Sequence, residues 1–275
     1  MNTSTGFKVG LYVDSQNIYK SGGNNMRYDI LREFVCRDGS EPIRLNAYIS
    51  YDKERSENDS NYRVKTERFH SILRSFGYKV ILKEVKWYND EDGQRFGKAN
   101  ADLDLAVDLL NESKNLDKVT LVSGDGDFVK VVTSVQNQGC RVEVIAMENV
   151  STELKREADM FISGYRIPNL IPFNRKNNWG EVGSTVRGLC SYVNEQKTIG
   201  YLRFLTTISP YLLVLDSTSP ECPYKSAFFH LSSLPDSVDV SRLPNYNDIF
   251  EFELAHSKKK EGFFDAKNTR LVSNL

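Results

Sequence analysis

The feature that most constrains the fold is an alternation of strand-like and helix-like segments along the first 174 residues. Apolar or alternating runs typical of buried strands occupy residues 7–14, 43–51, 78–88, 118–122 and 141–147, with a last short strand expected near 165–170. Amphipathic segments with helical spacing occupy residues 28–38, 61–77, 100–113, 127–139 and 151–163. Strands separated by helices of this length favour βαβ units. We therefore predict an α/β domain over residues 1–174, with a mostly parallel sheet between two layers of helices.

The pattern changes after a polar stretch at residues 175–184 that contains glycine. Short strand-like runs then follow one another without a long helix, at residues 185–193, 198–205, 211–217, 226–231, 248–256 and 261–272. Several short strands separated by turns favour a small β-barrel. We predict that residues 175–184 are a linker and that residues 185–275 form an all-β domain.

Composition restricts the function classes. The 275 residues include 36 basic and 37 acidic side chains, so binding to nucleic acid would need a local patch rather than an overall positive charge. The four cysteines are too scattered for a zinc knuckle or a redox pair, and they favour free thiols. No apolar run is long enough to span a bilayer, and no signal peptide is visible. We expect a cytoplasmic protein with no membrane partner.

Four aspartates follow strands or begin a helix. Asp14 ends the first predicted strand, and the stretch "TLVSGDGDFVKVV" places Asp125 and Asp127 just after strand 118–122. Asp102 lies in the first turn of helix 100–113. Carboxyl ends of neighbouring parallel strands share one edge of a sheet, so these side chains would meet there if the two strands are adjacent. Two polar residues are placed to orient a water or a ligand beside them, Asn17 and Ser123.

Carboxylates crowded into one cleft either take up protons or bind a hard divalent cation. Mg²⁺ or Mn²⁺ is the expected ligand, and an ion held in this way supports phosphoryl chemistry. Simpler interpretations remain open at this stage. The Asp–Gly stretch around Asp125 also suits a turn, Asp127 also suits a cap for the next helix, and Asp102 also suits the helix dipole.

Three further acidic residues recur along the same helix, at Asp104, Asp108 and Glu112. They are interpreted as a solvated stripe opposite the apolar residues Leu103, Ala106, Val107 and Leu110. For Asp104 and Asp108, a supporting role beside the acidic site is the alternative.

The motifs "LYVDSQNIY", "GKANADLDLAVDLL", "TLVSGDGDFVKVV" and "STELKREADMFI" together resemble the NYN family of PIN-like ribonucleases, over about residues 6–172. The resemblance implies a PIN-like α/β/α sandwich and a metal-dependent RNA phosphodiesterase. The motif positions of the family fall on the residues Asp14 and Asn17, Lys98 and Asp102, and Ser123, Asp125 and Asp127. The four aspartates would be catalytic and would hold the metal. Lys98 would contact a phosphate or be an ordinary surface lysine.

The second domain carries aromatic residues suited to stacking on bases. Tyr192, Tyr201, Phe228 and His230 lie on three predicted strands, with Lys197 nearby. The segments "GLCSYVN", "KTIGYL" and "AFFHL" are similar to a cold-shock domain, which has an OB fold. Ile199 and Leu231 depart from that pattern, since the family prefers aromatic residues there. The alternative is that the four rings fill the barrel core, as we expect for Phe229, Phe250, Phe252, Phe263 and Phe264.

These patterns predict a Mg²⁺- or Mn²⁺-dependent ribonuclease whose OB-like barrel binds single-stranded RNA. A catalytically inactive RNA-binding protein is the first alternative. A phosphohydrolase with Asp14 as nucleophile is the second, although that chemistry usually has another acid at the position of Gln16. A homodimer is compatible with the sequence.

Overall fold

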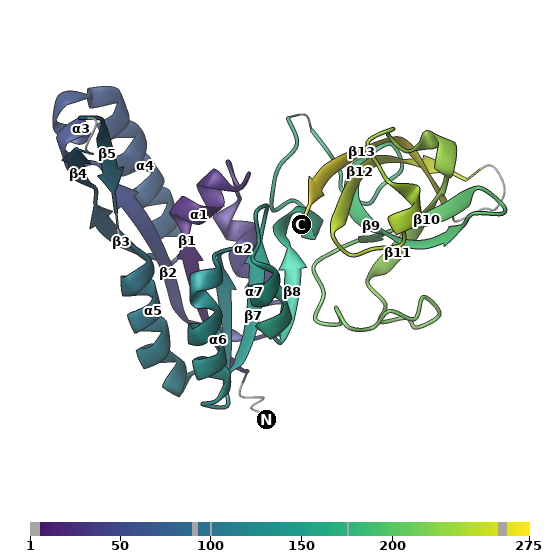
Figure 1. Cartoon of the computed structure of the whole chain (residues 1–275). Coiled ribbons are helices and arrows are strands. Elements are labelled where there is room, and N and C mark those ends of the chain that lie inside the picture. The colour runs from purple at the N-terminus through teal and green to yellow at the C-terminus, as the bar shows by residue number, and fades with distance from the viewer. Residues whose placement is uncertain (1–5, 90–92, 100, 175, 258–262) are drawn as a thin grey trace. The chain divides into compact units, whose positions relative to one another are not determined.

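The computed structural model describes residues 6–89, 93–99, 101–174, 176–257 and 263–275 (Figure 1). The chain divides into two compact units. The first comprises Met1–Asn24, Asp38–Ala146 and Val150–Phe161, and the second comprises Asn25–Arg37, Met147–Asn149 and Ile162–Leu275.

A six-stranded sheet has the order β3-β2-β1-β6-β7-β8 (Figure 1). Its strands are β1 (Lys8–Asp14), β2 (Glu41–Tyr51), β3 (Lys79–Glu84), β6 (Lys118–Val122), β7 (Arg141–Ala146) and β8 (Met160–Ser163). Neighbouring strands from β3 to β7 pair in parallel. Every residue of β6 is buried, as expected for a central strand covered on both faces. The predicted α/β sandwich is confirmed.

Helices connect the strands. They are α1 (Ser15–Lys20), α2 (Tyr28–Val35), α3 (Lys53–Asn58), α4 (Ser60–Ser75), α5 (Ala101–Glu112), α6 (Val129–Gln136) and α7 (Thr152–Glu157), with short 3₁₀ helices η1 (Ser113–Asn115), η2 (Gly126–Phe128) and η3 (Gly164–Arg166). Helices α5, α6 and α7 lie side by side (Figure 1). Side-chain caps start several of them; Asp59 accepts from Tyr62 N–H at α4, and Ser151 accepts from Leu154 N–H at α7.

Three local predictions were wrong. The segment 78–88 is two strands, because β3 ends at Glu84 and β4 (Lys86–Asn89) turns away to form an antiparallel hairpin with β5 (Arg95–Lys98). The helix predicted over 151–163 ends at Glu157, and its second half is β8. The segment 165–170 contains η3 in place of the expected strand. Helices α1 and α3 were not predicted.

The second unit contains a closed five-stranded barrel with the order β10-β11-β13-β12-β9, consistent with an OB-like domain (Figure 1). Its strands are β9 (Thr185–Asn194), β10 (Ile199–Leu205), β11 (Tyr224–His230), β12 (Asp248–His256) and β13 (Phe264–Asn274), and it also has the 3₁₀ helices η4 (Leu231–Ser233) and η5 (Val240–Arg242). Buried aromatic side chains fill its interior, namely Phe204, Phe229, Phe250 and Phe252.

Two features of this unit differ from the sequence prediction. Residues 211–217 form no strand; a turn bond joins Val214 N–H to Tyr211 O, and Leu213 is 76% exposed. Phe263 is exposed, whereas Phe264 packs against the barrel core.

The stretch predicted as a linker packs against the barrel. Trp179 Nε1 donates to the backbone oxygen of Leu205 at 2.7 Å, and Trp179 contacts the barrel core. Asn177 and Thr185 exchange two hydrogen bonds. No helix in the described part of the chain is both long enough and apolar enough to cross a membrane.

Candidate functional site

The sheet places Asp14 beside the loop that follows β6. Strands β1 and β6 are neighbours, and Val13 lies opposite Val122. Asp14 is 2% exposed, and its carboxylate accepts hydrogen bonds on both oxygens. The Asn17 N–H donates to Oδ1 at 3.0 Å, which caps α1, and the Ser123 hydroxyl donates to Oδ2 at 3.1 Å. The buried carboxylate is therefore held in one orientation by groups from both strand ends.

The loop after β6 is connected to the same network. Gly124 N–H donates to Asn17 Oδ1 at 2.9 Å, and Asp125 N–H donates to Ser123 Oγ at 3.2 Å. Asp127 N–H donates to Asp125 Oδ1 at 3.0 Å, which caps η2. Asn17 and Ser123 thus connect the ends of the two strands. The capping residue is Asp125, whereas the simpler interpretation placed the helix cap at Asp127.

Gly126 approaches another part of the chain closely. A Cβ atom at this position would lie 3.0 Å from Ser151 Oγ, and Ser151 N–H donates to Gly124 O at 2.9 Å. The glycine therefore allows the loop to pack against the residue that caps α7.

The acidic side chains influence each other electrostatically. Burial raises the pKa of Asp102, and the charges of Asp14, Asp125 and Asp127 raise it further, whereas Lys20 lowers it. Burial also raises the pKa of Asp14, against the effect of its hydrogen bonds with Asn17 and Ser123, and Asp125 adds to the increase. The structure therefore brings the four predicted aspartates together at one edge of the sheet, with Asp125 half-buried and Asp127 exposed.

The donor chemistry of this cluster suits a hard cation, because all four side chains offer carboxylate oxygens and repel one another. As they lie, however, no three His, Cys, Asp or Glu side chains among the described residues are arranged to hold an ion. Asp14 and Asp125 direct oxygens at backbone N–H groups. Direct binding by three carboxylates therefore requires side-chain rotation. Lys98 is the last residue of β5, and its side chain lies outside the described residues.

The acidic stripe of α5 contacts the sheet, so its interpretation as a solvated stripe was wrong. Tyr48 Oη donates to Asp108 at 2.8 Å, Tyr12 Oη donates to Glu112 at 2.8 Å, and Lys83 Nζ donates to Asp104 at 2.7 Å. Burial and these carboxylate partners raise the pKa of both tyrosines. The apolar side of the helix is also different from that expected: the buried residues are Ala101, Leu105 and Leu109, whereas Leu103 and Val107 are exposed.

Four aromatic side chains form a continuous row on three strands of the barrel, and we call Tyr192, Tyr201, Phe228 and His230 the aromatic row. Tyr201 on β10 lies opposite Tyr192 on β9 and Phe228 on β11. The ring centroids are 6.0 Å apart for Tyr192–Tyr201, 5.9 Å for Tyr201–Phe228 and 5.0 Å for Phe228–His230.

The aromatic row lies outside the barrel core. Tyr192 is 47% exposed, His230 is exposed, and the two central rings are half-buried. Adjacent residues point inward instead; Leu202, Ala227 and Phe229 are buried. Placing the row in the core was therefore the wrong alternative. Lys197 is exposed in the turn between β9 and β10, where its N–H donates to Asn194 Oδ1 at 2.9 Å.

Comparison with known proteins gives one family match, to the NYN domain over residues 8–170. The "Low amplitude and bright protein LabA" of Synechococcus elongatus is 26% identical over 162 residues, covering 56% of this chain and 82% of LabA. A crystal structure of a protein of unknown function from Vibrio parahaemolyticus is 28% identical with a TM-score of 0.47, covering 59% of this chain and 96% of that one. The family match ends before the barrel begins.

Proposed function

The chain belongs to the NYN domain family of PIN-like nucleases, and from that premise we propose that it is a Mg²⁺- or Mn²⁺-dependent ribonuclease whose barrel binds single-stranded RNA. The observation that carries the proposal is the convergence of Asp102 with Asp14, Asp125 and Asp127; burial raises the pKa of Asp102, and the charges of these three side chains raise it further. Mutually repelling carboxylates of this kind cost free energy in the folded state, which a bound cation would recover.

Asp14, Asp102, Asp125 and Asp127 would hold the ion between them. When bound, the ion supplies a more acidic water and neutralises charge on the phosphate. The residues of the chain then have separate tasks. Without an ion, Ser123 and Asn17 orient Asp14, and the capping bond at η2 orients Asp125. Binding of the ion by three carboxylates would rotate these side chains and exchange some of these hydrogen bonds for contacts with the ion.

The barrel would bind the RNA substrate. Bases would stack on the aromatic row, and Lys197 would meet the RNA backbone. In this proposal residues 1–174 form the nuclease domain and residues 185–275 form the RNA-binding domain, with 175–184 between them.

The test is cleavage of a labelled single-stranded RNA with and without Mn²⁺. We expect Asp125→Asn to abolish Mn²⁺-dependent cleavage, because it removes one negative charge from the cluster while its amide oxygen can still accept from Asp127 N–H. The matched control is Asp236→Asn, which changes an exposed aspartate of the second unit and should leave cleavage intact. Full activity in Asp125→Asn would rule out this assignment.

A second candidate is an RNA-binding protein without catalysis. It is favoured by the exposed aromatic row and by the absence, among the described residues, of a group arranged to hold a metal. The same experiment separates the two, because an RNA-binding protein without catalysis leaves the RNA uncut both with and without Mn²⁺.

A further inference from the structure

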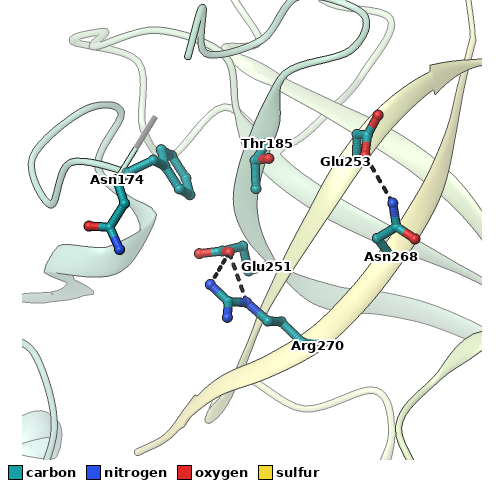
Figure 2. A pocket seen from close by; sticks show the side chains of 7 residues that line it. Asn174, Thr185, Glu251, Glu253, Asn268 and Arg270 are labelled. Carbon is teal, nitrogen blue, oxygen red and sulfur yellow. Dashed lines mark hydrogen bonds and ion pairs between the residues drawn. The ribbon is translucent and has the colours of Figure 1, made fainter. Parts of the chain in front are cut away.

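A pocket opens on the barrel at strands β9, β12 and β13 (Figure 2). Its volume is about 390 Å³, within the range of about 300–1,000 Å³ typical of small-molecule sites. Its lining comes from three strands and from the segment that precedes the barrel, and consists of Phe173, Asn174, Thr185, Glu251, Glu253, Asn268 and Arg270. None of these residues belongs to the aromatic row.

The charge of Glu251 is already compensated. Its carboxylate is 7% exposed and accepts from Arg187 Nε at 2.8 Å and from Arg270 Nε at 2.9 Å. Arg187 is equally buried, whereas the Arg270 side chain is 68% exposed. Arg270 also donates to Glu251 from Nη2, and its largely exposed side chain lies open to a ligand beside the pocket.

Glu253 is a carboxylate of the lining that can still accept hydrogen bonds. Asn268 Nδ2 donates to its Oε2 at 3.0 Å, which orients the half-buried carboxylate (Figure 2). Within the described residues, no hydrogen bond reaches Glu253 Oε1 and no basic side chain pairs with this carboxylate. A ligand here gains most by donating N–H groups to Glu253.

Phe173 supplies an aromatic surface in the same lining. The Arg187 guanidinium lies over its ring at 4.2 Å from the centroid, and Trp179 lies 6.1 Å away between ring centroids. These contacts hold the ring in place. A planar ligand is suited to a pocket that combines a fixed ring with polar groups.

We propose that this pocket binds a guanine base. Guanine carries two adjacent donors, N1–H and the 2-amino group, which a carboxylate such as Glu253 accepts together. The other bases lack this pair: adenine and cytosine place an acceptor beside their amino group, and uracil has a single N–H between two carbonyls. Bases in single-stranded RNA are recognised in this way, by stacking and by hydrogen bonds to their Watson–Crick edges. Arg270 then meets the attached phosphate.

The base has two conceivable sources, a free guanine nucleotide or a guanosine within an RNA strand. The second source rests on the proposed function, in which the chain holds single-stranded RNA. Both sources would present the same contact between the Glu253 carboxylate and guanine. Binding is measured with EDTA present, so that metal-dependent cleavage does not occur during the assay.

The experiment measures calorimetric affinities of the full chain for GMP, AMP, CMP and UMP, and for an all-uridine oligonucleotide with and without one central guanosine. A bidentate contact discriminates by about 5- to 150-fold. We expect GMP to bind more tightly than AMP, CMP and UMP, or the guanosine oligonucleotide to bind more tightly than the all-uridine one, or both, by a factor in this range. A gain with GMP alone identifies the free nucleotide as the source, and a gain in the oligonucleotide identifies the strand.

Glu253→Gln should remove the preference, because the glutamine oxygen still accepts from Asn268 while its amino group faces the guanine donors. Asn268→Gly removes the hydrogen bond to Glu253 and should reduce the guanine preference. The variant should still fold, because Asn268 has φ of +51°, which glycine adopts freely. Glu221→Gln, an exposed control, should retain the preference. Equal binding of all bases by the wild type, no binding at all, or an undiminished guanine preference in folded Glu253→Gln overturns the proposal. If the wild type prefers guanine but does not cleave RNA, only the proposed nuclease activity is contradicted.

Discussion

The double substitution Tyr201→Ala/Phe228→Ala tests whether the aromatic row binds RNA. The two rings are central in the row, on neighbouring strands, with centroids 5.9 Å apart and an interplanar angle of 69°. Because the rings are nearly edge-to-face, one base cannot stack flat on both. Each ring is therefore expected to receive its own base.

The expected loss of binding free energy follows from the two stacking surfaces that the substitution removes. Stacking on an aromatic ring contributes roughly 1–3 kcal/mol per base, and both rings are half-buried by their neighbours, which leaves less than a full face for each base. We expect binding to weaken by about 2–4 kcal/mol, or about 30- to 900-fold. Removing the interactions of these rings with Tyr192 and His230 also costs stability, about 0.5–1.5 kcal/mol per pair. The barrel should remain folded, because its core rings are unchanged.

The assay is fluorescence anisotropy with labelled single-stranded RNA at fixed salt concentration, together with thermal unfolding of each variant. Tyr246→Ala is the matched control, since Tyr246 is 76% exposed and lies outside the row. Binding of the double variant at wild-type affinity, with the barrel folded, would refute the assignment of the row to RNA. The row would then be a surface for a protein partner.

Three further predictions concern charges. Burial raises the pKa of Asp14, so the folded state holds its proton more tightly than the unfolded state; the unfolding free energy is expected to fall as pH rises above the usual aspartate range. Asp14→Asn should lessen this fall and leave stability at neutral pH equal or higher in metal-free buffer, as denaturant titrations at several pH values will show. Added Mn²⁺ should raise the melting temperature of the wild type but hardly that of Asp102→Ala/Asp125→Ala, because the ion would bind only the assembled cluster. If the melting temperature of both proteins rises equally, the ion binds elsewhere. Arg187→Met should destabilise the second unit, because Glu251 loses a buried partner, but by less than the about 3–5 kcal/mol of a fully broken buried pair, because Arg270 still pairs with Glu251. Chemical denaturation that shows no loss of stability contradicts this.

The sequence was sufficient for features set by local pattern. Alternating strand and helix periods predicted the parallel sheet, because strands joined through helices pair in parallel. The position of Asp14 at the end of a buried strand, and of Asp125 after another, predicted that they share one edge. The two-residue period of Phe228 and His230 placed both side chains on one face of their strand.

Tertiary contacts decided the features that depend on partners far along the chain. The helical pattern of residues 151–163 gave way after Glu157, because Asp159 N–H bonds to Val142 O and the chain joins the sheet beside β7. The acidic stripe of α5 faces the sheet because Tyr48 and other polar residues of distant strands hydrogen-bond to it.

The pocket proposed to bind guanine also depends on contacts that the local sequence pattern does not predict. Glu253 and Asn268 belong to different strands, Phe173 precedes the barrel, and only closure of the barrel brings them into one lining. Local periodicity assigns each residue to a face, since it depends on the backbone geometry of its own segment. Which distant side chains then meet at that face depends on the path of the whole chain, which only the tertiary structure determines.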